Sequence, residues 1–340
     1  MTSTSHRLPI AIAATVIVLG TFTYLSALPG LRKGPGPVGR RLRKIRVEEP
    51  LPEGFKRIFV DGLNGGKLEL LTNEKAQDEG KAPLLMVHGG MGSARCYDRW
   101  AAYFASKGRN VYSLSLSGHG HSYRPENFNS MTCFDLVHDI DSAAKYIVSA
   151  HPASPAPVLT GHSAGGGESQ LTVATLPPNT FSGVILLAPF PPTGGLSVYR
   201  EWLSFDWLLF PRFFWQGADN MSPLSTPALL KRAFFSDTYK EEDLDDFFKQ
   251  MSSEESAGWA ESMTMKFTDS EMVKANVLDR VHIISASNDR LMTPPIMKEL
   301  VSLYGCSTDT VEGSGHHMMF DDRWYEAAQF AEAKLQAWNL

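Results

Sequence analysis

The chain has 340 residues, of which 43% are hydrophobic and 20% charged, which is enough to bury a large core in one globular domain with additional segments. Its net charge of −5 gives no general electrostatic support for a nucleic-acid partner, so we expect none. The three cysteines, Cys96, Cys133 and Cys306, match no zinc-site spacing and cannot all pair within the chain, which favours reduced thiols and no metal site.

The amino terminus predicts a membrane anchor. Residues 8–28 carry no charge over 21 positions, and a helix of that length at ~1.5 Å per residue spans roughly 30 Å, enough to cross a bilayer. A secretory signal peptide is the alternative, although the apolar stretch is longer than usual for one and no clear small-x-small cleavage site follows. We therefore predict a single-pass anchor, or a signal peptide, within residues 1–30.

Residues 31–54 predict a basic linker between this anchor and the rest of the protein. Seven positive charges occur there before the first acidic residue, namely Arg32, Lys33, Arg40, Arg41, Arg43, Lys44 and Arg46. Basic residues beside a membrane span meet anionic lipid headgroups and favour the cytoplasmic side. We expect the membrane to be a partner and the body of the protein to face the cytosol, with the secretory pathway as the alternative.

From residue 55 onward, short apolar runs alternate with helical patterns. Runs at 55–60 and 67–72 predict an opening pair of strands, and buried strands are predicted at 83–88, 110–116, 157–160, 181–189 and 280–287. Helical spacing of apolar residues at 135–150 and 168–175 lies between them. This alternation predicts an α/β fold, with a mostly parallel sheet and helices on both faces, and places ligand chemistry at the carboxyl ends of the strands.

The first such strand end reads His88-Gly89-Gly90-Met91-Gly92-Ser93. Glycines let backbone N–H groups approach a substrate closely, so Gly90 or Met91, together with Ala164, could form an oxyanion hole. A histidine at a strand end beside two glycines is more often a structural hydrogen-bonding residue than a catalytic base. We therefore predict structural roles for His88 and Gly89.

The next strand runs into Gly161-His162-Ser163-Ala164-Gly165. A bare G-x-S-x-G arises readily by chance in a chain rich in glycine and serine, but this one lies between a buried strand and a helix, as a nucleophile elbow requires. Gly161 and Gly165 then leave room for neighbouring backbone around the strained serine. The stretch lacks the lysine of a P-loop and the glycine spacing of a dinucleotide fingerprint, so we expect no cofactor there.

Residues 191–276 form an insertion too long for an ordinary crossover, which predicts a helical lid. Aromatic residues crowd its first part, around all sides of the predicted helix. We expect most of them to pack the lid onto the body and some to line an acyl pocket or contact membrane, with Trp202, Trp207, Phe210 and Phe214 as candidates.

Two further residues complete a candidate triad. Asp289 follows the strand at 280–287, and His316 follows Gly315 in a loop before the last predicted helix. The order Ser163, Asp289, His316 is the triad order of an α/β hydrolase. His317 is the main rival for the base, although the G-x-G-H arrangement favours His316.

The motifs at 88–93, 117–122 (S-G-H-G-H-S), 161–166, 285–289 (S-A-S-N-D) and 313–317 (G-S-G-H-H) occur in the order of landmarks of one family. From about residue 55 to 340 the chain resembles α/β hydrolases with a helical lid, and is most similar to the branch of monoacylglycerol lipases, lysophospholipases and proline-type aminopeptidases. It departs from that branch at Ser115-Leu116-Ser117, where D-x-R is usual, and at Ala286, where glycine is common. The resemblance implies a hydrolase core at 55–190 and 277–340.

The resemblance also implies acyl transfer through a covalent Ser163 intermediate, with no cofactor or metal. The expected substrates are small-molecule carboxylic esters or lipids with apolar acyl chains. A biosynthetic thioesterase or cyclase, an aminopeptidase-like hydrolase and a non-catalytic binding protein on the same fold are the alternatives. A serine at the elbow argues against epoxide hydrolases and haloalkane dehalogenases, which use aspartate there.

Overall fold

The computed structural model describes residues 36–45, 50–74 and 80–340. They contain an eight-stranded sheet in the order β1-β2-β4-β3-β5-β6-β7-β8. The strands are β1 (Lys56–Asp61), β2 (Lys67–Thr72), β3 (Leu84–Val87), β4 (Val111–Leu114), β5 (Val158–His162), β6 (Gly183–Leu187), β7 (Val281–Ala286) and β8 (Ser307–Val311). β2 pairs antiparallel with β1 and with β4, and the other pairs are parallel. The predicted mostly parallel sheet is confirmed.

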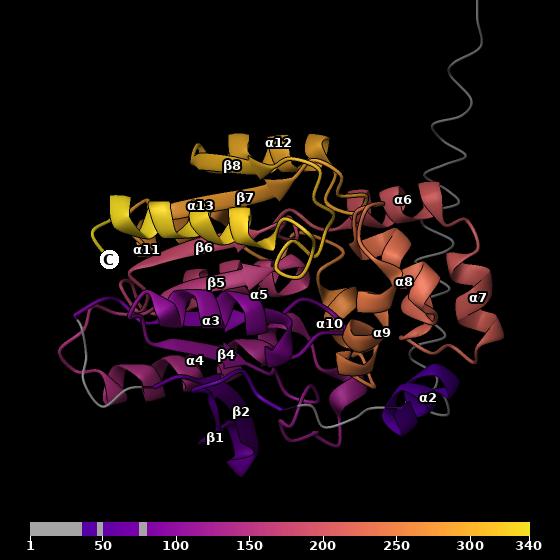
Figure 1. Cartoon of the computed structure of the whole chain (residues 1–340), viewed down its shortest axis with the longest axis horizontal. Coiled ribbons are helices and arrows are strands. Elements are labelled where there is room, and N and C mark those ends of the chain that lie inside the picture. The colour runs from indigo at the N-terminus through magenta and orange to yellow at the C-terminus, as the bar shows by residue number, and fades with distance from the viewer. Residues whose placement is uncertain (1–35, 46–49, 75–79) are drawn as a thin grey trace, which may run out of the picture.

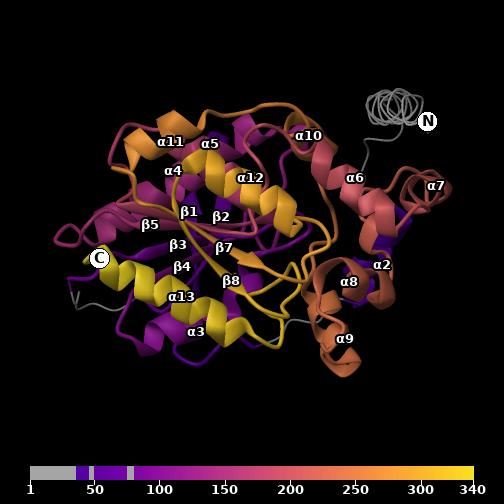
Figure 2. The ribbon, with the colours of Figure 1, turned by 90° about the horizontal axis from the view of Figure 1, so that it is seen from above.

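Helices cover both faces of this sheet, as predicted from the alternating pattern (Figure 2). One face carries α3 (Asp98–Ser106) and α13 (Trp324–Ala337), which pack against each other. The other carries α4 (Cys133–Ala150), α5 (Ser163–Thr175), α11 (Ser270–Asn276) and α12 (Pro294–Tyr304). The central strands β3, β5 and β6 are buried along their whole length, which explains their continuous apolar sequences.

The segment between β6 and β7 supplies a group of helices at one end of the sheet (Figure 1). They are α6 (Leu196–Phe205), α7 (Leu209–Trp215), α8 (Pro227–Phe234), α9 (Glu241–Gln250) and α10 (Ala257–Ser262). Short 3-10 turns lie at Leu63–Gly65, Ala94–Tyr97, Phe128–Ser130 and Ser222–Leu224. α11 falls inside the range predicted as a lid but packs on α5 and α12, so we use the name lid for α6 to α10 alone.

Part of the predicted basic linker is a helix, α2 (Pro37–Ile45), which packs on α9. Its Val38 and Leu42 are buried, and the Asp219 carboxylate accepts hydrogen bonds from the backbone N–H groups of Val38 and Gly39. Apolar residues four positions apart on a charged segment allow one face to dock, which the count of basic residues alone did not reveal. Within the described ranges no helix is long and apolar enough to cross a membrane, and the predicted anchor at 1–30 lies outside them.

Candidate active site

Ser163 occupies the sharp turn between β5 and α5. Its φ of 53° is in the left-handed region that non-glycine residues rarely adopt. The neighbouring glycines allow this turn to fit: a Cβ on Gly165 would lie 2.0 Å from the carbonyl oxygen of His88, and one on Gly161 would lie 2.5 Å from that of Gly165. Backbone atoms cannot move aside as a flexible side chain can, so both positions require glycine.

The three predicted triad residues come together at the carboxyl ends of their strands. The Ser163 hydroxyl lies 2.8 Å from Nε2 of His316, whose Nδ1 lies 2.7 Å from Oδ2 of Asp289. The other carboxylate oxygen of Asp289 accepts hydrogen bonds from the backbone N–H groups of Leu291 and Met292, at 2.7 and 2.9 Å. The side chains of His316 and Asp289 are fully buried. The arrangement leaves Nε2 of His316 able to accept the serine proton.

His88, His162 and His317 are held in the neutral form. Nε2 of His88 accepts a hydrogen bond from the Leu116 backbone N–H, so its Nδ1–H donates to the Gly89 carbonyl. Burial lowers the pKa of His88 and of His162 well below the usual value, and lowers the pKa of His317 to about 3. The ring of His317 packs among the rings of Phe234, Phe235, Phe247 and Phe320. The Ser163 hydroxyl hydrogen-bonds to Nε2 of His316 and not to any of these rings.

The three candidate oxyanion donors differ in whether their backbone N–H groups are already hydrogen-bonded. Ala164 is the second residue of α5, where backbone N–H groups find no partner within the helix. Within the described part of the chain, the Gly90 N–H also has no hydrogen-bond partner. The Met91 N–H, by contrast, donates to the carboxylate of Glu255. Gly90 and Ala164 therefore have backbone N–H groups available to a substrate. The alternative prediction, that Met91 supplies one of the two oxyanion donors, is wrong because its N–H is bound to Glu255.

A cavity of about 160 Å³ opens beside Ser163. Trp202 of α6 and Phe210 of α7 line it, together with Gly90, Met91 and Ala164. Trp207 and Phe214, which the sequence analysis grouped with them, do not line it and are 75% and 39% exposed. Trp207 lies beyond the end of α6, and Phe214 follows the buried, cavity-lining Phe213 on α7, where adjacent residues do not share a face.

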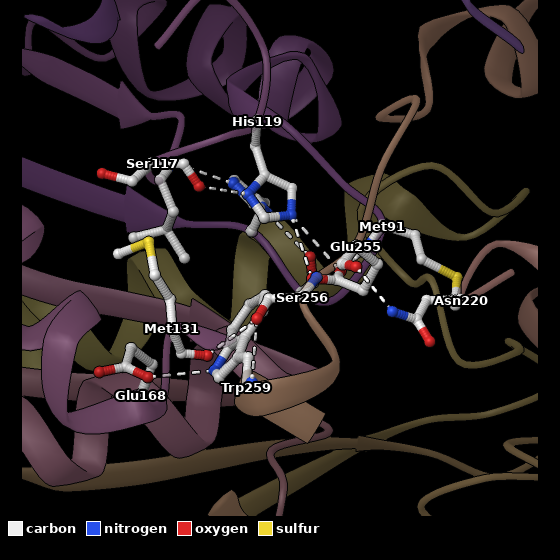
Figure 3. Close-up of polar contacts among 12 residues, drawn as sticks. Met91, Ser117, His119, Met131, Glu168, Asn220, Glu255, Ser256 and Trp259 are labelled. Carbon is white, nitrogen blue, oxygen red and sulfur yellow. Dashed lines mark hydrogen bonds and ion pairs between the residues drawn. The ribbon is translucent and has the colours of Figure 1, made fainter. Parts of the chain in front are cut away.

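Glu255 is a residue of the site that the sequence did not predict, and its partner is His119. Glu255 precedes α10, lines the cavity, and faces His119 of the S-G-H-G-H-S loop, with Nε2 of His119 lying 3.3 Å from Oε1 (Figure 3). The S-G-H-G-H-S motif had drawn attention to His119. No signal could have found Glu255, because it is one of several acidic residues in the lid sequence and only its contacts distinguish it.

Two serines and two buried carboxylates hold the loop before His119. Ser115, which stands where aspartate is usual, donates to the buried Glu69 carboxylate and accepts a hydrogen bond from the Ala94 N–H. Ser117 donates through both its backbone N–H and its hydroxyl to Asp139 of α4. Burial raises the pKa of Asp139 to about 6. Carboxylates from β2 and α4 thus fix this loop.

Another buried acid, Glu168, connects α10 to the elbow helix α5. The indole N–H of Trp259 in α10 donates to Oε2 of Glu168 in α5, at 3.1 Å (Figure 3). Burial raises the pKa of Glu168 well above its usual value, which favours the neutral acid.

Among the described residues, no group of three or more histidine, cysteine, aspartate or glutamate side chains is arranged to hold a metal ion.

Comparisons with known proteins agree with this architecture. The sequence profile described as the alpha/beta hydrolase family matches residues 84–333. A non-heme chloroperoxidase from Streptomyces lividans is 30% identical over 112 residues, which are 32% of this chain and 37% of that protein. This match therefore spans little more than a third of the relative's length.

Two solved structures share the fold at low sequence identity. A thermophilic esterase from Thermogutta terrifontis is 14% identical, with a TM-score of 0.61 over 84% of this chain and 100% of its own. A bacterial membrane phospholipase A is 18% identical, with a TM-score of 0.59 over 98% of this chain and 96% of its own. Both likenesses concern the fold alone.

Proposed function

The chain belongs to the alpha/beta hydrolase family, and on that premise we propose that it is a serine hydrolase that cleaves carboxylic esters of apolar acyl chains. The observation that carries the proposal is the hydrogen-bonded series Ser163, His316, Asp289 beside an apolar cavity. Ser163 is the nucleophile, His316 the general base and acid, and Asp289 the residue that orients the imidazole.

In this mechanism the Ser163 oxygen attacks the ester carbonyl while its proton passes to Nε2 of His316. The Asp289 carboxylate stabilises the resulting imidazolium, and the backbone N–H groups of Gly90 and Ala164 stabilise the negative oxygen of the tetrahedral intermediate. The alcohol leaves with the proton from His316, which forms the acyl-enzyme. Water, deprotonated by His316, then releases the acid and restores Ser163.

The cavity supports an apolar acyl group. Trp202, Phe210, Phe213 and Met263 contribute large apolar side chains to its wall. Each methylene buried there contributes roughly 0.8 kcal/mol, so the specificity constant should rise with acyl length until the cavity is full. A preference for acetyl esters or for charged aminoacyl amides would contradict a lipid-like substrate.

The proposal includes attachment to a membrane with the catalytic body on the cytosolic side. It rests on the uncharged stretch at 8–28, on the basic residues that follow it, and on the exposed Trp207 and Trp215 of the lid. Amphipathic tryptophan rings are suited to a membrane–water interface. The full chain should pellet with membranes and resist carbonate extraction, and removal of residues 1–29 should make it soluble. A mature amino terminus near residue 28, or a glycan on Asn220 of the Asn220-Met221-Ser222 glycosylation sequon, would contradict this orientation.

The deciding experiment compares the wild-type chain and Ser163→Ala for covalent labelling by a fluorophosphonate, followed by assays on a panel of esters, thioesters and aminoacyl amides. We expect labelling of the wild type only and the highest kcat/KM on medium or long acyl esters. Equal labelling of both proteins, or of neither, would contradict the serine-hydrolase mechanism. A thioester or amide optimum would retain the mechanism and reject the ester as substrate.

A further inference from the structure

The lid holds the loop that carries the Gly90 N–H. The Met91 N–H donates to Oε2 of Glu255, and the Met91 carbonyl accepts a hydrogen bond of 3.0 Å from the Ser252 N–H. Both peptide groups of Met91 are thus bound by the segment between α9 and α10. Met91 itself has a φ of 62°, a conformation that a non-glycine residue keeps only when its surroundings impose it.

Three contacts fix Glu255 in place. Its Oε1 accepts a hydrogen bond of 2.7 Å from the Ser256 N–H, and its backbone carbonyl accepts one of 3.0 Å from the side chain of Asn220. Its carboxylate faces His119, and Figure 3 shows His119 and Met91 on different sides of it. A Cβ on Gly90 would lie 3.4 Å from Oε2, so this oxygen lies next to Gly90 itself.

The hydrogen-bond pattern makes His119 a cation. Its Nδ1 lies 3.0 Å from the Ser117 carbonyl oxygen, which can only accept, and its Nε2 faces the Glu255 carboxylate, which as an anion can only accept. Both ring nitrogens must therefore donate, as only the imidazolium can. Burial, the largest single effect, lowers the pKa of His119, but the Glu255 carboxylate, the Ser117 carbonyl and Asp139 together outweigh it, so the pKa of His119 is raised.

We infer that Glu255 and His119 are positioning residues for the oxyanion loop. Glu255 holds Met91 so that the adjacent Gly90 N–H points at the reacting carbonyl, and the His119 cation balances a carboxylate that would otherwise repel the developing oxyanion. This inference rests on the proposed serine-hydrolase function and adds to it a catalytic contribution from the lid. Neither residue touches the substrate oxygen, and both act through the loop at Gly90 and Met91.

The first test compares Glu255→Ala with Glu255→Gln, using kcat and KM on a medium-chain p-nitrophenyl ester. The alanine variant loses the acceptor for Met91, so kcat should fall about 30- to 100-fold with KM changed less than about threefold. The glutamine amide oxygen can still accept that hydrogen bond, but its N–H₂ group then faces the Ser256 N–H, so kcat should recover only in part, to at least about threefold above Glu255→Ala. Glu254→Gln is the matched control, because the adjacent Glu254 pairs with Arg43 and Arg124 and should leave kcat within about twofold.

The second test examines the charge balance with His119→Asn and the double variant His119→Asn/Glu255→Gln. The single variant leaves a buried carboxylate unpaired beside the oxyanion position, and kcat should fall about 100-fold. The double variant removes both charges and keeps the acceptor, so its kcat should be at least about tenfold higher than that of His119→Asn. A merely structural role would make the double variant the worse of the two.

Fluorophosphonate labelling separates failure of this inference from failure of the proposed function. Slow but complete labelling of Glu255→Ala, with an unchanged Tm, would show an intact Ser163–His316 pair and support the inference. A folded Glu255→Ala with wild-type kcat, a loss confined to KM, or a double variant no better than His119→Asn would overturn it while leaving the hydrolase assignment intact. An unlabelled wild-type protein would instead remove the proposed function, and this inference with it.

Discussion

Asp289→Asn is the substitution whose effect follows most directly from the hydrogen bonds of the site. One oxygen of Asp289 accepts from two backbone N–H groups at 2.7 and 2.9 Å, and the other faces Nδ1 of His316. An asparagine must point its only oxygen at the two N–H donors, because the reverse orientation would set donor against donor. Its amide N–H₂ then faces His316 and requires Nδ1 to be unprotonated.

The consequence is a change of tautomer at His316. The proton moves to Nε2, which lies 2.8 Å from the Ser163 hydroxyl and can no longer accept its proton. The substitution also removes the negative charge of Asp289 that stabilises the His316 imidazolium. The same substitution in a serine protease triad lowers kcat about 10⁴-fold. We expect a similar loss of kcat for Asp289→Asn, which corresponds to roughly 5 kcal/mol in activation free energy.

The assay is the initial rate of ester hydrolysis at saturating substrate, with Tm as the check on folding. Asp141→Asn is the control, since among the described residues Asp141 on α4 pairs with the exposed Lys145, and the substitution should leave kcat within about twofold. A folded Asp289→Asn that loses less than tenfold in kcat would show that the tautomer of His316 does not depend on Asp289, and would refute this reasoning.

Three further predictions concern the elbow, a buried histidine and the cavity wall. Gly165→Ala should cost about 3 kcal/mol in urea unfolding, because its Cβ would lie 2.0 Å from the His88 carbonyl oxygen, and a loss below about 1 kcal/mol would contradict that geometry. Burial lowers the folded-state pKa of His317 to about 3, so below about pH 6.5 the unfolded chain binds a proton that the native state does not, and the native state loses stability. His317→Leu should therefore reduce the stability lost between pH 8 and pH 5 by about 2 kcal/mol. An unchanged pH dependence of the unfolding free energy would disprove this prediction. Trp202→Ala should lower kcat/KM for long-chain esters about tenfold relative to acetyl esters, whereas Trp207→Ala, being outside the cavity, should leave this ratio unchanged; equal effects would contradict the cavity assignment.

The sequence alone predicted the fold because the evidence for it is local. Buried parallel strands require continuous apolar runs such as 84–87 and 183–187, and the helices between them show the spacing of one packed face. The elbow was also predictable, since the steric conflict around Ser163 is decided by glycines within two residues of it. The order of Ser163, Asp289 and His316 along the chain followed from the order of the strand ends.

The structure alone decided which lid residues belong to the site. Trp202 and Trp207 look equivalent in the sequence, but α6 ends at Phe205, so the first faces the cavity and the second faces solvent. The contact of Glu255 with Met91 joins residues 164 positions apart, and no local pattern distinguishes Glu255 from its acidic neighbours. A periodic pattern specifies which face of an element is buried, whereas a single polar contact between distant segments depends on how the lid and the sheet pack together.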